Sequence, residues 1–294
     1  MRSPALLAAA ALLLSGCAAS PAAPPATGIQ VVASTNVYAD IAREVGGNDV
    51  TVTAIIDSPS KDPHDYEASS HDLLAVSRAD LIVQNGAGYD SFMGRLLHQA
   101  NHVPVLTAVD LVRHQGDNEH VWYDLATARA MASAIAEDLV ALDPAHANGY
   151  RTRADQFDRR LDALNARVRA IRESARGRTV LATEPVPLYL LFSLGLRDRT
   201  PPELSAAVEE GGEIAPGLLL DTISLLSRGG VDLLAYNSQA ESGQTRRLRD
   251  AAATGRVPVV AFSETLPART GYLDWMAANV DHVASALSPR DGSS

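Results

Sequence analysis

The stretch YRTRADQFDRRLDALNARVRAI, residues 150–171, decides how the chain is organised. Its apolar residues recur at alternating spacings of four and three, and Arg and Asp fill most of the other faces. The apolar positions are Tyr150, Ala154, Phe157, Leu161, Leu164, Val168 and Ile171. This period predicts one amphipathic helix of about 20–25 residues, roughly 30–37 Å long. A core-facing helix that joins two lobes fits its length and position, and a coiled-coil dimer seam is the alternative.

On both sides of this helix the chain alternates β-branched runs with helical patterns, which is typical of parallel sheets. Strands are expected at 29–34, 50–56, 80–84 and, more weakly, 103–106, and then at 179–183, 231–236 and 257–262. Helices are expected at 37–45, 71–78, 89–99 and 125–142, and then at 186–194, 217–227, 244–253 and 272–287. The predicted fold class is therefore α/β, with parallel-sheet lobes at 29–145 and 177–290 joined by a long backbone helix within 146–176.

The first residues predict an export signal. Residues 1–17 read MRSPALLAAAALLLSGC, in which one Arg precedes an apolar run that is too short to span a bilayer. The run ends in LSGC, which resembles the bacterial lipoprotein processing box, so we expect cleavage before Cys17 and a lipid anchor on its thiol. An ordinary signal peptide with an incidental cysteine is the alternative. The Pro-rich and Ala-rich residues 18–28 are expected to form a flexible tether.

Composition excludes several classes of function. The 294 residues carry a net charge of −10, and Lys61 is the only lysine among 25 basic residues. A chain with this charge offers no basic field for nucleic acid. Because Cys17 is the only cysteine, a disulfide framework and a thiolate metal cage are also excluded.

Two of the eight histidines stand in distinctive contexts. His64 lies in KDPHDYE (61–67), shortly after an expected strand, and His120 lies in NEHVWYD (118–124), just before an expected helix. The others, which have no comparable context, are His71, His98, His102, His114, His146 and His282. A single histidine in either context is more often structural than a metal ligand.

Two carboxylates in the second half occupy matching positions. Glu184 directly follows the strand expected at 179–183, and Glu264 follows the strand expected at 257–262. Ligands of open α/β sheets bind beyond the carboxyl ends of the strands. Two neutral imidazoles from one lobe and two carboxylates from the other would match the charge of a divalent cation in the cleft. A helix cap or a solvated loop residue is the alternative for each carboxylate alone.

Other catalytic and binding motifs are missing from the sequence. It has no GxSxG elbow, no GxxxxGK[ST] phosphate loop and no HExxH helix. The stretches Gly86-Ala87-Gly88 and Gly211-Gly212 are too short to be dinucleotide fingerprints. The acidic run Glu209-Glu210, with Glu213, is most simply a solvated loop.

At these residues the chain resembles the metal-binding receptor lipoproteins of zinc and manganese ABC importers. The matching motifs are DPHDYE (62–67), ADLIVQNGAG (79–88), HVW (120–122), AYNSQ (235–239), ETLP (264–267) and YLDWM (272–276). They follow the family's order, and the resemblance covers residues 29–288. The resemblance implies two α/β lobes joined by one long helix, with limited hinge motion.

The resemblance also implies a set of metal ligands. These are His64 and His120 from the first lobe, and Glu184 and Glu264 from the second. Zinc receptors often have His at the position of Glu184, and manganese receptors often have Glu. The position of Glu264 commonly holds Asp in the family, so Asn237 or Gln239 are alternatives that could reach the ion or a bound water.

The expected function is capture of one Zn²⁺ or Mn²⁺ as a transported ligand. The protein would be a monomeric, lipid-anchored, extracytoplasmic receptor that delivers the ion to the membrane permease of an ABC importer, and it would not be an enzyme. Carboxylate-rich sites suit Mn²⁺, whereas the general order of affinities favours Zn²⁺. Two alternatives are a receptor for a metal chelate or haem, and a metal-dependent hydrolase with Asp65, Glu67 or Glu119 as its base.

Overall fold

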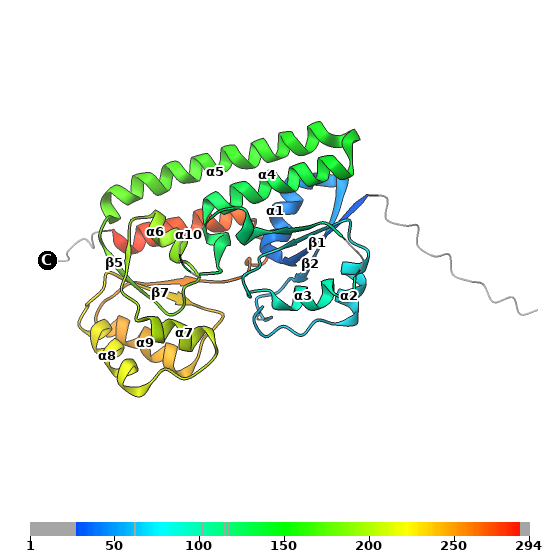
Figure 1. The fold of residues 1–294 in the computed structure, drawn as a ribbon. Helices are drawn as coiled ribbons and strands as arrows, with labels where there is room; N and C mark the ends of the chain where they lie inside the picture. The colour runs from blue at the N-terminus through cyan, green and yellow to red at the C-terminus, as the bar shows by residue number, and fades with distance from the viewer. Residues whose placement is uncertain (1–27, 62, 101–102, 114–115, 117, 289–294) are drawn as a thin grey trace, which may run out of the picture.

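The computed structural model describes residues 28–61, 63–100, 103–113, 116 and 118–288. In these ranges the chain forms two α/β lobes, which lie side by side along one long helix, α5 (Ala147–Ala175) (Figure 1). The expected signal peptide with Cys17, and all but the last residue of the expected tether, lie outside the described residues. None of the described helices is both long and apolar enough to cross a membrane.

Each lobe is built on a four-stranded parallel sheet, and both sheets have the same strand order. The first sheet runs β2-β1-β3-β4 and the second runs β6-β5-β7-β8. The first contains β1 (Ile29–Thr35), β2 (Val50–Ile56), β3 (Leu81–Gln84) and β4 (Val105–Thr107). The second contains β5 (Thr179–Ala182), β6 (Arg197–Asp198), β7 (Leu233–Asn237) and β8 (Val259–Phe262). This order places a crevice at the carboxyl ends of the strands in each lobe.

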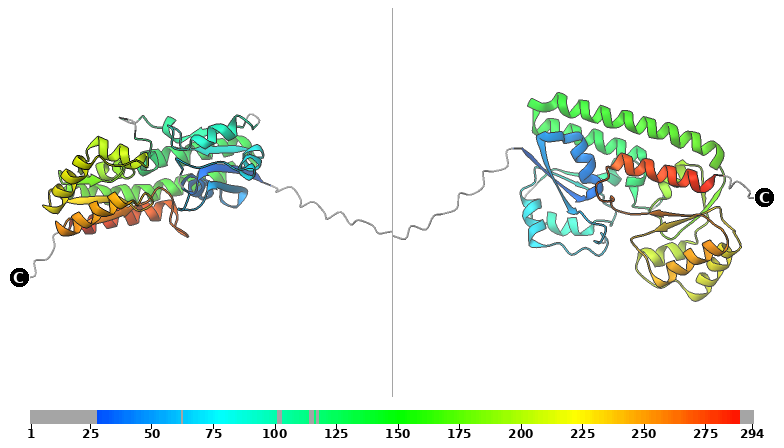
Figure 2. Two further views of the ribbon diagram at one scale, coloured as in Figure 1. Left: turned by 90° about the horizontal axis from the view of Figure 1, so that it is seen from below. Right: turned by 180° about the vertical axis from the view of Figure 1, so that it is seen from behind.

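Helices cover both faces of each sheet. The first lobe contains α1 (Asn36–Gly46), α2 (Ser70–Ser77), α3 (Ser91–Leu97) and α4 (Leu125–Leu142). The second contains α6 (Leu188–Ser193), α7 (Pro202–Glu209), α8 (Pro216–Ser227), α9 (Gly243–Thr254) and α10 (Tyr272–Leu287). Helices α1, α4 and α10 pack against α5 on one side of the molecule (Figure 2). Helices α2 and α3 cover the opposite face of the first sheet, and α8 and α9 cover that of the second.

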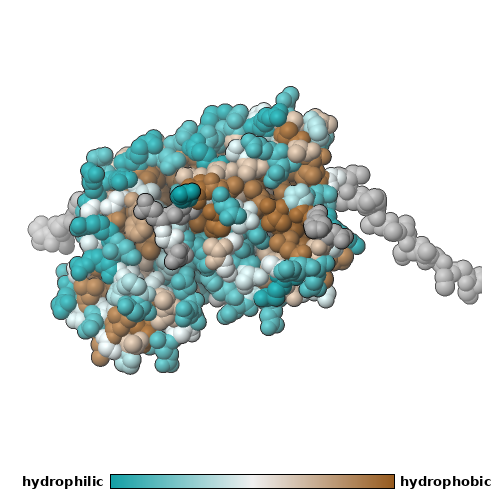
Figure 3. Space-filling model, viewed as in Figure 1, coloured by the Kyte–Doolittle hydropathy of each residue, from teal (hydrophilic) through white to brown (hydrophobic). Residues whose placement is uncertain are grey.

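One apolar core passes through both lobes beneath α5. Alternate strand residues separate the two faces: Val31 belongs to this shared core, and Val32 belongs to the smaller core under α2 and α3. Of the predicted apolar face of α5, Tyr150, Phe157, Leu161, Leu164 and Val168 are buried, and Ala154 and Ile171 are partly buried. The core-facing interpretation of this helix is therefore confirmed. The helix is longer than predicted, with 29 residues, and its outward face, along the top of Figure 3, is hydrophilic.

Arginines of α5 fasten both lobes to this helix. Arg153 donates to the carbonyl oxygens of Val45 and Gly46, at 2.7 and 2.8 Å, and so caps the end of α1. Arg160 bonds Glu44 of α1 at 3.0 Å and Asp274 of α10 at 3.4 Å. Because α1 belongs to the first lobe and α10 to the second, Arg160 of α5 is bonded to both lobes.

A second fastening joins the loop after β8 to the first lobe. The side chain of Asn36, at the start of α1, donates to the carbonyl oxygen of Leu266 at 3.1 Å and accepts its N–H at 3.0 Å. The N–H of Tyr272 donates to the Asp40 carboxylate at 2.7 Å. The loop between β8 and α10 therefore belongs structurally to both lobes.

The sequence did not predict β6 and α7. Strand β6 has two residues, Arg197 and Asp198, and neither is β-branched or apolar, so only its pairing with β5 makes it a strand. Helix α7 has eight residues and begins with Pro202 immediately after Pro201, so it spans too few turns to show a clear period.

Candidate metal site

Three of the four predicted ligands line one pocket between the lobes, whereas the residues whose potential ligand atoms lie within 4.8 Å of one another are His64, Glu119, His120 and Glu209. His64, Glu184 and Glu264 line this pocket. His120 lies beside His64, with 6.3 Å between the centroids of the two rings. Glu184 and Glu264 each lie two residues beyond the end of a strand, β5 and β8. The carboxyl ends of both sheets therefore face the same space, as the sequence predicted.

His120 is buried and held in a fixed orientation. Its Nδ1 lies 2.8 Å from the side-chain oxygen of Asn118. Because an amide oxygen can only accept, this contact makes Nδ1 the donor and leaves the lone pair of Nε2 for a metal ion. The rings of Tyr89 and Trp122 pack against the imidazole, with centroids 5.8 and 5.1 Å away. Burial, and then the nearby His64, lower the pKa of His120 to about 3, so the ring is neutral at pH 7.

His64 lies on the loop after β2 and is less constrained. Its side chain is 26% exposed, and its ring meets that of Tyr89 edge-on at 5.2 Å. Its Nε2 lies 3.5 Å from Oε1 of Glu119. The backbone of Glu119 is held in turn, because the side chain of Asn85 donates to its carbonyl oxygen at 2.9 Å. Burial, and then the charge of Glu209, raise the pKa of Glu119 to about 7.

A single amide joins the two carboxylates of the second lobe. The Asn237 side chain, at the end of β7, donates to Oε1 of Glu264 at 2.8 Å and also to Oε2 of Glu184. All three residues are buried. Two carboxylates that lie close together repel each other. The shared neutral donor offsets this repulsion and keeps them adjacent.

Gln239 joins the carboxylate side of the pocket to the other lobe. Its side-chain oxygen accepts the N–H of Glu264 at 2.5 Å, and its amide nitrogen donates to the carbonyl oxygen of Pro59 at 2.8 Å. Pro59 precedes His64 on the same loop. Asn237 and Gln239, the two alternatives to Glu264 as a ligand, thus both hold Glu264 in place in this structure.

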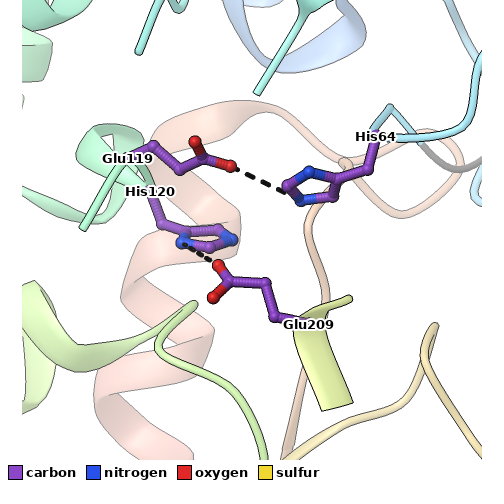
Figure 4. Close-up of side chains that lie close together, drawn as sticks. All are labelled: His64, Glu119, His120 and Glu209. Atoms are coloured by element: carbon purple, nitrogen blue, oxygen red, sulfur yellow. Dashed lines mark ion pairs between the residues drawn. The ribbon is translucent and has the colours of Figure 1, made fainter. Parts of the chain in front are cut away.

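Glu209 lies in a different environment from the one that the sequence predicts. Glu209 ends α7, and its Oε1 lies 3.9 Å from Nδ1 of His120. The interpretation of this acidic run as a solvated loop is therefore wrong for Glu209. Figure 4 shows the side chains of Glu209, Glu119, His64 and His120 directed toward a common space. One potential ligand atom from each of these four residues lies within 4.8 Å of the other three.

The electrostatics of the pocket favour a cation. Half of its fourteen lining residues are acidic, and no described lining residue is Lys or Arg. The acidic residues are Asp65, Glu119, Glu184, Glu209, Glu210, Glu241 and Glu264. The raised pKa of Glu119 reflects burial and the negative charge of neighbouring carboxylates, whereas the lowered pKa of His120 reflects burial and the nearby His64. Nitrogen and oxygen donors in such a field are suited to a divalent metal ion.

Comparison with solved structures reveals the same fold. The chain superposes on the periplasmic zinc binding protein TroA of Treponema pallidum with a TM-score of 0.76 at 22% identity, over 89% of this chain and all of that one. It also matches FpvC of Pseudomonas aeruginosa, solved in complex with Mn²⁺, with a TM-score of 0.75 at 24% identity, over 88% of this chain and 98% of that one.

Sequence comparison gives a consistent result. The chain is 27% identical to the manganese-binding lipoprotein MntA of Halalkalibacterium halodurans over 95% of both chains. It is 24% identical to the manganese ABC transporter substrate-binding lipoprotein PsaA of Streptococcus anginosus, over 88% of this chain and 89% of that protein. The model of the family described as zinc-uptake complex component A, periplasmic (ZnuA), matches residues 31–286. With this match extending over most of its length, the chain belongs to the ZnuA family.

Proposed function

We propose that this protein is the extracytoplasmic receptor of a metal ABC importer, which binds one Zn²⁺ or Mn²⁺ and delivers it to the membrane permease. The observation that carries the proposal is the pocket itself, which is lined by His64 of one lobe and by Glu184, Glu209 and Glu264 of the other, amid excess negative charge. The ZnuA family match and the manganese-binding relatives support it. The ion is bound and released unchanged, so the proposed function is transport and not catalysis.

The proposed ligands are His64, His120, Glu184 and Glu264. Two neutral imidazoles and two carboxylates carry a total charge of −2, which one divalent ion neutralises. Glu184 and Glu264 already share one donor, Asn237. A metal ion supplies a full positive charge where the amide supplies only partial charge, so binding the ion strengthens the attraction between the two sides of the pocket.

The protein is further proposed to be anchored outside the cytoplasmic membrane and to act as a monomer. Cleavage before Cys17 and attachment of lipid would anchor the chain outside the cytoplasmic membrane, where a permease can receive the ion. All four proposed ligands come from a single chain, so a monomer is sufficient for binding.

Metal titration tests the proposed function. Purified protein, stripped with a chelator, is titrated with Zn²⁺ and with Mn²⁺, and one ion per chain is expected. His64→Ala and Glu184→Ala should each weaken the affinity at least tenfold. His71→Ala is the matched control, because His71 lies on α2 with its side chain 86% exposed. Failure of the parent protein to bind either ion would refute the function, and parent-like binding by a variant would refute that ligand.

A further inference from the structure

We propose that Glu209 is an additional oxygen ligand of the bound ion and that it favours Mn²⁺ over Zn²⁺. This inference rests on the proposed function, since it concerns the same ion in the same pocket. It adds a ligand from α7, a helix that supplies none of the four ligands proposed above.

The position of Glu209 is built into the second lobe. Helix α7 is anchored by Leu204 and Val208, which are buried in the core under α8 and α9. Its last residue, Glu209, then extends from this anchored turn into the pocket. Its side chain is only 28% exposed, although a glutamate at a helix end can readily extend into solvent. Keeping this carboxylate half-buried among other acidic groups is costly unless a cation joins them.

The distances suit coordination after a small adjustment. Oε1 of Glu209 lies 3.9 Å from Nδ1 of His120, the ring nitrogen that donates to Asn118, and so approaches the same ring whose Nε2 is the proposed metal donor. Donors around one ion, with bonds of about 2.0–2.2 Å, lie roughly 3–4 Å from one another. The group formed by Glu209, His64, His120 and Glu119, with potential ligand atoms within 4.8 Å, is therefore about an ångström wider than a closed shell. Side-chain rotation alone can close such a gap.

The number and type of donors connect Glu209 to metal selectivity. Zn²⁺ in protein sites is usually four-coordinate and tetrahedral, so two imidazoles and two carboxylates complete its shell. Mn²⁺ prefers more ligands and more oxygen. A fifth donor that is a carboxylate oxygen therefore adds more to the affinity for Mn²⁺ than to that for Zn²⁺.

The test compares two neighbouring glutamates on the full chain. Glu210 also lines the pocket but is exposed, so Glu210→Gln removes the same charge one residue away from Glu209. We expect Glu209→Gln to weaken Mn²⁺ binding at least tenfold and Zn²⁺ binding less than threefold in competition titrations. Glu210→Gln should change both affinities less than threefold.

Three results would overturn the inference. Parent-like Mn²⁺ binding by Glu209→Gln refutes ligation, and an equal loss in Glu210→Gln shows that the charge acts at long range. An equal loss of Mn²⁺ and Zn²⁺ affinity in Glu209→Gln refutes the role in selectivity. Thermal unfolding of both variants under chelation checks that they fold. If the parent protein binds neither ion, it is the proposed function that fails, and this outcome is distinct from the other three.

Discussion

The carboxylate side and the histidine side of the pocket differ in how firmly their side chains are held. On the carboxylate side, Glu184 and Glu264 are 5% and 6% exposed and share one amide donor, Asn237. On the histidine side, His120 is 1% exposed and held by Asn118, while the side chain of His64 is 26% exposed on a loop. The carboxylate side is therefore assembled in advance, whereas one histidine is fixed and the other can adjust.

This difference follows from the charge of the groups. Two carboxylates brought together repel each other, so they need a shared donor to remain adjacent. The two imidazoles carry no negative charge, so they need no such shared donor. We infer that the carboxylate side sets the geometry of the site and that His64 completes it.

The largest expected effect comes from joining the two sides with an ion. Saturating Zn²⁺ or Mn²⁺, at about 1,000 times the dissociation constant, should stabilise the folded protein by about 4 kcal/mol. Thermal unfolding with metal and with excess chelator measures this gain. The Glu184→Ala variant, with its affinity weakened at least tenfold, should lose at least about 1.4 kcal/mol of this gain at the same metal concentration. An unfolding temperature that is identical with and without metal would contradict a site that spans both lobes.

The second largest effect is expected from removing the amide that holds the two carboxylates together. Asn237→Ala should lower the free energy of unfolding under chelation by about 2–3 kcal/mol, because two buried carboxylates lose a hydrogen-bond donor. Denaturant unfolding measures the change. Ser238→Ala is the control, since it removes a single neutral hydrogen bond to Phe262 next to the site. Equal losses in the two variants would show that the shared amide has no special role.

The third effect is the pH dependence of metal affinity that protonation of Glu119 causes. Below its pKa of about 7, Glu119 is protonated and no longer adds its negative charge to the pocket, so the affinity for a cation should fall as the pH decreases from 7.5 to 5.5. A loss of about tenfold is expected. His120 contributes nothing over this range, because its pKa is lowered to about 3. Glu119→Gln should flatten the profile measured by metal titration, and an unchanged profile in this variant would assign the proton to another group.

The smallest effect tests the bridge between the sides. Gln239→Ala removes the contacts with Pro59 and with the N–H of Glu264 and should weaken metal binding about fivefold, equivalent to about 1 kcal/mol. Gln84→Ala is the matched control, because Gln84 bonds Thr107 within the first lobe and is not among the residues that line the pocket. Equal metal affinities for the two variants would show that the bridge does not assist binding.

The sequence predicted the features that depend on local pattern. The apolar period at 150–171 predicted the buried face of α5, and the β-branched runs predicted the sheets whose carboxyl ends form the pocket. Glu184 and Glu264 were predicted as ligands because each lies just beyond the end of an expected strand, and in the structure each lies two residues beyond one. These signals are carried by neighbouring residues, so they can be recognised before the chain folds.

Other features depend on contacts between distant segments. Nothing near Glu209 in the sequence indicates that α7 would place it beside His120, which is 89 positions away. The role of Asn237 likewise exists only when β5, β7 and β8 lie together. A search for short helices next to acidic runs could have selected Glu209 as a candidate, but not its partners.

The hydrogen bonds between Asn36 and Leu266 connect the position of the first lobe to that of Glu264. Glu264 lies two residues before Leu266, so a carboxylate that follows a strand of the second lobe is tethered to the first residue of α1. A movement of α1 relative to the second lobe would therefore displace the segment that carries Glu264. With Glu264 as a ligand, as proposed, we expect such a movement to weaken metal binding by shifting one carboxylate.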